Sequence, residues 1–533
     1  MRRALSAAAL ALGLTAPAAA AQGTRPDSAA HPALRARTSY EDLQMFSQVL
    51  NQIRVNHPDS VDTHEMFMAA IQGMIHAADP HSYVIAAARL SPERQKDYEA
   101  GRLVPVPVDF SFFGGSPVVA AVAPSSEAAR LDILPGDELV EMDGRPVQAE
   151  SPLELDVALA GPRNSTARLT FERRRADGTQ ARLVRAVKRE RVADETAVPA
   201  AFMLDARTGY ARITSFGNDR VSDDLHAALG RLEAAGMQRL VLDLRDNGGG
   251  LVDEAAKVAG EFLPAGAVVY SSEGRKPEMN ETAHVRRSFW KRERAYPIVL
   301  MQNDGTASAS ELVAGALQDH DRALVVGRPS FGKSLIMRGF PLTDGSMIEL
   351  VVGHMKTPCG RVIQRQYRSI SRRDYYRMAR EARDTVGRPS CRTDGGRTVY
   401  GGGGIYPDVP FAERPSAPVW LARLEEDAVP TRWAGGYLTA NPAAFTTPEA
   451  LAQKPELPAA ALADFRTFAR AQGTAVPAGA EADAELQRTL VRTLASSRWG
   501  AAGLYRVAAA LDPEVGDAVK QFDRATQILG AQR

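Results

Sequence analysis

The sequence predicts a multidomain α/β protein, with a strand-rich module ahead of an α/β core and helical parts at both ends. Two observations lead to this fold class. Over residues 193–415, short apolar runs alternate with segments whose apolar residues recur at helical spacing, as in alternating strands and helices. Residues 101–192 instead contain short strand-like runs separated by turn residues. With 533 residues, the chain is long enough for about three or four domains.

The first 21 residues have the pattern of a secretory signal peptide. Two arginines follow the initial methionine, an uncharged alanine-rich stretch comes next, and small residues precede Gln22. Residues 22–37 then form a polar spacer. We therefore expect an exported protein, periplasmic or extracellular. The apolar stretch is too short and too rich in alanine to span a bilayer, so no membrane span is expected after signal removal.

Both ends of the remaining chain are predicted to be helical. Residues 416–533 are alanine-rich, are interrupted near residues 473–479 and carry no recognisable chemistry. In residues 38–100, apolar side chains recur at helical spacing in two segments joined by a turn over residues 56–60. Such methionine-containing stripes are typical of ordinary core, and we expect them to be buried. Their positions are Tyr40, Leu43, Phe46, Val49, Leu50 and Ile53, then Met66, Met68, Ile71, Met74 and Ile75.

The module over residues 101–192 resembles a PDZ domain. The resemblance rests on residues 126–144, which include the turn Leu134-Pro-Gly-Asp137. It implies a small domain that adds a peptide to a sheet edge and holds the terminal carboxylate with backbone N–H groups. The usual glycine-rich carboxylate loop is not obvious. The candidate peptide-binding residues that occupy its approximate place are Phe112, Phe113 and Gly114.

The core contains a serine placed for nucleophilic chemistry. A strand-like run over residues 298–301 leads through a turn to a helical pattern from about Ala309, which puts Ser308 at a helix N-terminus. Unpaired N–H groups and the helix dipole favour negative charge there, so the serine could attack a carbonyl and have the oxyanion held. The same residues also fit a capping box of Ser308 and Glu311, in which the serine only closes the helix start.

A lysine and a glycine-rich turn complete this predicted site. Lys333 follows a second strand-like run over residues 323–326. A lysine can be the general base for a serine when burial lowers its pKa enough to leave it neutral, and we therefore predict a Ser308–Lys333 dyad. Residues 248–250 are glycines between a strand-like run and a helix, and the Gly249 N–H is a candidate for half of an oxyanion hole. A plain tight turn is the alternative there.

Two competing motifs overlap Lys333. Residues Gly327–Ser334 match the phosphate-binding pattern G-x-x-x-x-G-K-[ST]. A phosphate loop opens a helix, whereas the residues after Lys333 predict a strand, and an exported protein meets no ATP supply. Ser330 and Lys333 also fit the S-x-x-K spacing of penicillin-recognising enzymes, but Pro329 and Gly332 disfavour the helix that this motif requires. We therefore favour the dyad.

Charge and cysteine content limit the expected partners. The chain has 65 basic and 64 acidic side chains, so its net charge does not indicate nucleic acid. Residues 361–383 contain eight arginines, and the acidic residues among them favour a solvated helix or hairpin. Cys359 and Cys391 are candidates for a disulfide in an exported protein. The nine histidines are scattered, and neither a metal nor a cofactor is expected.

Ordered motifs extend over nearly the whole chain, at residues 79–83, 242–250, 305–319, 331–333, 357–364 and 401–408. Together they resemble the carboxyl-terminal processing peptidases, or tail-specific proteases, a serine peptidase family of S41 type. The resemblance implies a crotonase-like α/β protease core with an inserted PDZ-like domain. It also implies Ser308 as nucleophile, Lys333 as base, the N–H groups of Gly249 and Ala309 as oxyanion donors, and Asp319 as a supporting residue.

The resemblance predicts an exported serine endopeptidase that recognises proteins through apolar, unstructured C-terminal tails. Such proteins are the expected partners, and an adaptor or self-association is left open. One departure concerns Met337, because the family commonly reads Phe-Gly-Lys-Gly-x-x-Gln and has glutamine at this place. A methionine cannot donate and accept as an amide does. A catalytically weak or inactive peptide-binding paralogue therefore stays open as the alternative.

Overall fold

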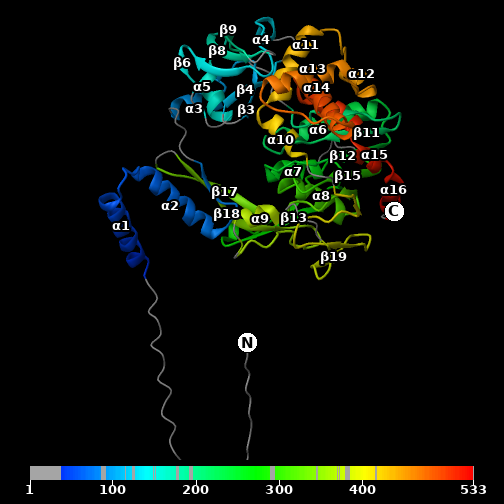
Figure 1. Cartoon of the computed structure of the whole chain (residues 1–533). Coiled ribbons are helices and arrows are strands. Elements are labelled where there is room, and N and C mark those ends of the chain that lie inside the picture. The colour runs from blue at the N-terminus through cyan, green and yellow to red at the C-terminus, as the bar shows by residue number, and fades with distance from the viewer. Residues whose placement is uncertain are drawn as a thin grey trace, which may run out of the picture. The chain divides into compact units, whose positions relative to one another are not determined.

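The described part of the chain, in the computed structural model (Figure 1), divides into two units, one up to Ile71 and one from Gln72 onward. The finer domain boundaries expected from the sequence stay predictions. The predicted signal peptide and spacer lie outside the described residues. The structure describes residues 38–85, 92–113, 116–122, 127–147, 149, 152–175, 179–190, 196–287, 294–343, 346–368, 370, 372–378, 384–413 and 417–531.

The two predicted N-terminal helices are present. Helix α1 (Ser39–Asn56) begins with a capping box, in which Thr38 and Glu41 exchange hydrogen bonds between side chain and backbone. Helix α2 (Thr63–Ala78) follows the predicted turn. The expectation that both stripes are buried is wrong, since α1 has no buried residue and α2 has one. The rings of Phe46 and Phe67 lie 5.9 Å apart, and a contact of this size is too small to bury either stripe.

The module over residues 101–192 is built on an antiparallel sheet, as its alternating pattern predicts. The strand order is β3–β4–β5–β8–β9, and β6 pairs with β5. Side chains such as Val119, Leu139 and Phe171 form its buried core. The likeness to a PDZ domain stays a prediction. The elements are β3 (Asp109–Phe113), β4 (Ser116–Ala121), β5 (Glu138–Met142), β6 (Arg145–Pro146), α5 (Pro152–Leu159), β8 (Thr166–Arg174) and β9 (Gln180–Lys188).

A six-stranded sheet forms the centre of the α/β core. Strands β11 to β21 are parallel, and β10 at the edge is antiparallel to β11. This arrangement follows from the predicted alternation of strands and helices and confirms the mixed α/β class. In sheet order the strands are β10 (Ala200–Met203), β11 (Thr208–Arg212), β12 (Arg239–Asp243), β15 (Ile298–Gln302), β16 (Leu324–Gly327) and β21 (Val409–Pro410).

Both faces of this sheet are covered, which explains why its strands are continuous apolar runs. On one face, Leu242, Leu300 and Val325 pack in a core shared with helices α6 (Val221–Ala234), α7 (Val252–Ala259) and α8 (Ala309–Asp319). On the other face, Val241, Val299 and Val326 pack with Val515 and Phe522. The latter two come from helices α15 (Pro513–Val519) and α16 (Phe522–Ala531), drawn in red in Figure 1. The end of the chain therefore completes the core.

A second, antiparallel sheet lies in the same compact unit and carries the residues that follow Lys333. Strand β18 (Met347–Lys356) pairs with β1 (Tyr83–Ile85), β13 (Val268–Gly274) and β17 (Leu335–Pro341), and β14 (Thr282–His284) pairs with β13. Strand β17 confirms that a strand follows Lys333. A helix, which a phosphate loop requires, is therefore not found at this position.

The C-terminal region is helical, as predicted. Its own core contains Trp433, Phe465 and Leu490. The longest helix, α14, bends at Gly500, whose φ is 64°. None of the described helices combines the length with the apolar character that a bilayer span requires. The helices before α15 are α10 (Val419–Glu426), α11 (Val429–Ala440), α12 (Pro448–Gln453), α13 (Ala459–Ala471) and α14 (Ala480–Leu511).

The prediction of a solvated structure for the arginine-rich segment is wrong in part. Helix α9 (Arg372–Met378) forms within it, but Arg361 and Arg365 are buried. Arg361 pairs with Asp319, and the Arg365 guanidinium lies 4.5 Å from the centre of the Phe331 ring. The ion pair and the contact with the ring replace the water that these two charges lose on burial. Neither contact can be predicted from amino-acid composition.

Candidate active site

Ser308 lies where strand β15 gives way to helix α8. The intervening turn is held by Asn303, whose N–H donates to Thr306 Oγ1 at 3.0 Å and whose side-chain oxygen accepts from Gly305 N–H at 3.1 Å. Ser308 has a φ of 58°, a region that costs a residue with a side chain about 1–3 kcal/mol. Sharp strand-to-helix turns of this kind expose nucleophilic serines in other hydrolases.

Glu311 joins the segment that carries Ser308 to the segment that carries Lys333. Its Oε2 accepts hydrogen bonds from the N–H groups of Ser308 and Lys333, each at 2.8 Å. Its Oε1 accepts from the Gly332 N–H at 2.7 Å and from the Ser330 hydroxyl. The structure thus brings the two segments of the predicted dyad to one carboxylate. From the sequence, Glu311 was predicted only to cap the helix. Its place in the motif at residues 305–319 could have indicated a larger role.

The capping box of Ser308 and Glu311, the alternative role for this serine, is present in the structure. The Ser308 N–H donates to the glutamate, as the box requires, and the Glu311 N–H donates to the Ser308 carbonyl oxygen at 2.9 Å. Helix α8 therefore begins with the capping box of Ser308 and Glu311 that its sequence predicts.

Burial raises the pKa of the Glu311 carboxyl, despite the four hydrogen bonds that it accepts. The side chain is 0% exposed. All four donors are neutral groups, and hydrogen bonds alone do not compensate for the loss of water around a charge. The Glu311 carboxyl therefore holds two chain segments together by hydrogen bonds from neutral donors alone.

The Lys333 side chain lies against Met337. The lysine Nζ donates to the methionine Sδ at 3.3 Å, so the residue at the place of the usual glutamine does contact the lysine, through a weak acceptor. Burial lowers the pKa of Lys333, although the negative charges of Glu311, Asp79 and Glu349 oppose this shift. The direction is the one that a lysine general base needs.

The two predicted oxyanion donors lie beside Ser308. Gly249 has a φ of 97°, and a Cβ atom added there would lie 2.7 Å from Ser308 Cβ and 2.8 Å from Ala309 N. A side chain is therefore excluded at this position. Ala309 is the first residue of helix α8, where N–H groups have no acceptor within the helix. The Gly249 N–H donates to Asn247 Oδ1 at 3.0 Å, so in this structure it has a partner already.

Asp319 lies at the far end of helix α8, roughly 16 Å from Ser308 by the rise of an α-helix. Its carboxylate pairs with Arg361 Nη2 at 2.6 Å and accepts from the Cys359 N–H at 3.1 Å. Cys359 is joined to Cys391 by a disulfide in this structure. Any support from Asp319 therefore reaches Ser308 through the helix and not by contact.

A polar and aromatic cluster next to Lys333 was missed by the sequence analysis. The Ser334 N–H donates to Gln364 Oε1 at 2.9 Å, and Gln364 Nε2 donates to the Tyr375 hydroxyl at 3.0 Å. His81 Nε2 lies 2.8 Å from the same hydroxyl, and the Tyr375 ring packs against Phe331. His81 and Gln364 belong to motifs that carry the family resemblance, but no spacing rule connects them to a tyrosine in helix α9.

A cavity of about 490 Å³ lies beside Gly250 and Met337. Gly250, next to the predicted oxyanion glycine, lines one part of it, and Met337, which contacts Lys333, lines another. Apolar side chains from Leu251, Val252 and Ile336 add to its surface. Charged side chains, among them Asp253, Glu278 and Arg338, also line it, so its surface is mixed in polarity.

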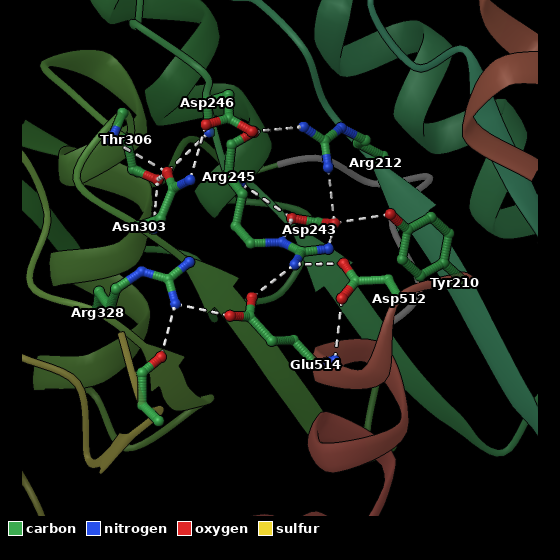
Figure 2. Close-up of polar contacts among 12 residues, drawn as sticks. Tyr210, Arg212, Asp243, Arg245, Asp246, Asn303, Thr306, Arg328, Asp512 and Glu514 are labelled. Atoms are coloured by element: carbon green, nitrogen blue, oxygen red, sulfur yellow. Dashed lines mark hydrogen bonds and ion pairs between the residues drawn. The ribbon is translucent and has the colours of Figure 1, made fainter. Parts of the chain in front are cut away.

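A second buried carboxylate, Asp243, organises the other side of the glycine-rich turn (Figure 2). It accepts from the Tyr210 hydroxyl at 2.7 Å, from Arg212 Nη1 at 2.9 Å and from Arg245 Nη2 at 2.7 Å. Burial acts to raise the pKa of Asp243, but the charges of Arg245 and Arg212 lower it well below its ordinary value.

The other predicted positions fall outside a common site. Ser330 is buried and donates to Glu311, in a segment that is not helical, so the S-x-x-K interpretation fails on geometry. Phe112 and Phe113 lie in strand β3. Their side chains, like Gly114 as a whole, lie outside the described residues. The predicted peptide-binding loop therefore stays a prediction.

Comparison with known proteins finds a peptidase family domain in the chain. Residues 207–370, which include all five predicted protease residues, match peptidase family S41. A carboxy-terminal-processing protease of Bartonella bacilliformis is 28% identical over 333 residues, covering 62% of this chain and 74% of that protein. The chloroplastic carboxyl-terminal-processing peptidase 2 of Arabidopsis thaliana is 33% identical over 247 residues, covering 45% of this chain and 46% of that protein.

Among solved structures, a photosystem II D1 C-terminal processing protease is 23% identical with a TM-score of 0.34, covering 70% of this chain and 87% of that one. The sequence matches show that the chain contains a peptidase S41 family domain over residues 207–370 and is similar to carboxy-terminal-processing proteases.

Proposed function

We propose that the chain is an exported serine endopeptidase that cleaves proteins with apolar, unstructured C-terminal tails through a Ser308–Lys333 dyad. The observation that carries the proposal is the pair of hydrogen bonds from the Ser308 and Lys333 N–H groups to one Glu311 oxygen. The S41 family domain supports the peptidase chemistry, and the carboxy-terminal-processing activity in the names of two relatives supports the substrate class. Export rests on the signal pattern at the start of the sequence.

The proposed reaction is acyl transfer to Ser308. Neutral Lys333 takes the hydroxyl proton while the serine oxygen attacks the scissile carbonyl carbon. The protonated lysine then gives this proton to the leaving amine, and the acyl-enzyme is hydrolysed by water that the same lysine deprotonates. The lowered pKa of Lys333 supports this role, because a neutral amine is required at the start of each step.

Two backbone N–H groups are proposed to hold the oxyanion. Ala309 offers the free N–H of a helix start, next to the nucleophile. Gly249 offers the second, and it must exchange its hydrogen bond with Asn247 Oδ1 for one with the oxyanion. The turn around Gly249 is therefore proposed to adjust when substrate binds, which is common for catalytic hydrogen bonds.

The substrate is proposed to be held at two places. The cavity beside Gly250 and Met337 would take a side chain near the scissile bond. The module over residues 101–192 would hold the substrate terminus in the manner of a PDZ domain and so raise the local concentration of the tail. An adaptor or self-association is not required by this scheme.

The test uses casein or a reporter with an apolar C-terminal tail. Ser308→Ala should abolish cleavage, and Lys333→Arg should do the same because an arginine cannot become neutral. Ser310→Ala is the matched control, since this neighbouring serine is buried and its hydroxyl has no partner in the described structure. Cleavage by purified Ser308→Ala or Lys333→Arg at the rate of the control would disprove the dyad.

A weak or inactive peptide-binding protein is the second candidate function. The observation that favours it is Met337, whose sulfur is a poorer partner for Lys333 than the glutamine common in the family. This function predicts that the wild-type protein binds a tail peptide without turnover. Wild-type cleavage that the Ser308→Ala variant lacks would exclude it.

A further inference from the structure

Glu514, near the end of the chain, contacts the segments on both sides of the candidate active site. Its Oε2 accepts from Arg245 Nη1 at 2.8 Å, and its Oε1 accepts from Arg328 Nη1 at 2.6 Å. Figure 2 shows this carboxylate between the two arginines. The residue lies in helix α15, well beyond the matched family region, and its side chain is only 8% exposed. A buried carboxylate that bridges two segments restricts both.

Asp512 holds this arrangement from the start of the same helix. Its Oδ2 accepts from Arg245 Nη1 at 2.6 Å, and its Oδ1 accepts from the Glu514 N–H at 3.0 Å. Arg245 also binds Asp243, so three carboxylates surround this guanidinium. The position of Glu514 is thus determined by a helix cap and by two fixed arginines.

Arg245 leads directly to the oxyanion turn and to Ser308. Two residues after it, Asn247 accepts the Gly249 N–H on its side-chain oxygen. The backbone oxygen of Asn247 accepts from the Ala307 N–H at 2.9 Å, next to the nucleophile. A shift of Arg245 would therefore be transmitted through a short stretch of chain to Gly249 and Ser308.

Arg328 leads in the same way to Lys333. It follows strand β16, and its backbone oxygen accepts from Gln302 Nε2 at 2.9 Å. The segment that begins there continues to Ser330, Gly332 and Lys333, which all bind Glu311. Besides Glu514, the Arg328 guanidinium binds the Ala412 carbonyl oxygen at 3.2 Å. Glu514 is therefore the carboxylate partner of Arg328 in this part of the structure.

We propose that Glu514 is a positioning residue, supplied by the C-terminal region, that aligns the oxyanion turn with the segment carrying the lysine. Glu311 links the Ser308 segment to the lysine segment. Glu514 links the oxyanion turn to the lysine segment through Arg245 and Arg328. The inference rests on the proposed peptidase function. It makes the C-terminal helices part of the catalytic unit and not an appended domain.

The test measures casein cleavage by the full chain with Glu514→Gln. Asp517→Asn is the matched control, because this acidic residue of the same helix pairs only with Lys520 at the surface in the described contacts. We expect kcat for Glu514→Gln to fall by roughly ten- to a hundredfold with KM within about twofold of wild type, since small misplacements at a distance reduce turnover strongly. Circular dichroism gives the folded fraction of each variant.

Arg328→Gln provides a second route if Glu514→Gln does not fold. It should lower kcat in the same way, and the double variant should lose little more than either single one, because both remove one link. A kcat equal to that of the control, or a loss that follows only the folded fraction, overturns the proposal. Folded wild-type protein without any cleavage would instead overturn the peptidase function itself.

Discussion

Glu311 and Asp243 are both buried carboxylates, but their hydrogen-bond partners differ in charge. Both side chains are 0% exposed. Glu311 accepts only from neutral donors, and burial raises its pKa. At Asp243 burial acts in the same direction, but Arg245 and Arg212 lower the pKa. The charge of the partners, and not the degree of burial, decides the sign of the shift.

This difference in partners suggests different roles, with Glu311 positioning the catalytic residues and Asp243 stabilising the fold. The Asp243 centre is saturated by charged partners, and without this carboxylate the buried Arg212 would keep only the exposed Asp246 as its ion-pair partner among the described residues. The Glu311 centre fixes backbone N–H groups and leaves the Ser308 hydroxyl and the Lys333 amine out of its hydrogen bonds. We therefore expect damage at Asp243 to appear in stability and damage at Glu311 to appear in turnover.

The largest effect is expected for Asp243→Asn, which leaves two buried arginines without their common partner. The free energy of unfolding at pH 7 should fall by about 3–5 kcal/mol, measured by urea denaturation. Because folding lowers the pKa of Asp243, its contribution is present above the unfolded pKa of about 3.9 and is lost only as pH falls toward the folded value. Glu273→Gln, at an exposed pair with Lys356, should cost less than about 1 kcal/mol. Equal losses would remove the contrast.

Glu311→Gln should act mainly on catalysis. A glutamine amide cannot accept at both ends, so either the pair of N–H groups or the Gly332 and Ser330 donors would lose their acceptor. We expect kcat to fall by roughly a hundredfold, the scale of a misplaced oxyanion donor, with about 1–3 kcal/mol of stability lost. Glu261→Gln, at a buried glutamate that pairs with Arg294, should lose stability and keep the kcat of the folded protein. The comparison fails if both variants keep kcat.

The pH dependence of cleavage sharpens the same contrast. Since burial lowers the pKa of Lys333, kcat/KM should rise about tenfold per pH unit below that pKa and reach a plateau below the usual lysine value of about 10.4. Glu349→Gln should move the midpoint downward, because the negative charge of Glu349 favours the protonated lysine. The measurement is a pH–rate profile, with Glu273→Gln as control. A midpoint that moves upward would contradict the assignment of the base.

The smallest effect is expected for Met337→Leu. This change removes the sulfur that accepts from Lys333 Nζ and keeps an apolar side chain of similar size. We expect kcat to change by less than about fivefold, because a net hydrogen bond contributes about 1 kcal/mol. A hundredfold loss in steady-state assays would place Met337 beside Glu311 in importance.

Local patterns predicted the elements that carry the site. The apolar run over residues 298–301, the turn and the helical spacing after Ala309 correspond to strand β15 and helix α8. Residues after Lys333 form strand β17, as their composition indicated. The same kind of reasoning failed for Arg361 and Arg365, since their burial depends on Asp319 and on the Phe331 ring, which no local pattern connects to them.

The sequence contained an indication, not used in the prediction, that helices cover both faces of the core sheet. Leu240, Val241 and Leu242 are consecutive apolar residues in β12, and such a strand must be covered on both faces. The helices between the strands cover only one face, where Leu242 packs. Helices α15 and α16 cover the other face. Periodicity could not predict which helices do so, because any amphipathic helix of the chain could pack there.

By itself the sequence determined where Ser308 stands relative to its helix and that a strand follows Lys333, because turn chemistry and hydrophobic periodicity act over a few residues. Only the tertiary structure decided that Glu311 joins the Ser308 and Lys333 segments and that Glu514 joins Arg245 and Arg328. Such bridges depend on which loops meet at the ends of parallel strands, and that meeting is set by packing across the whole core.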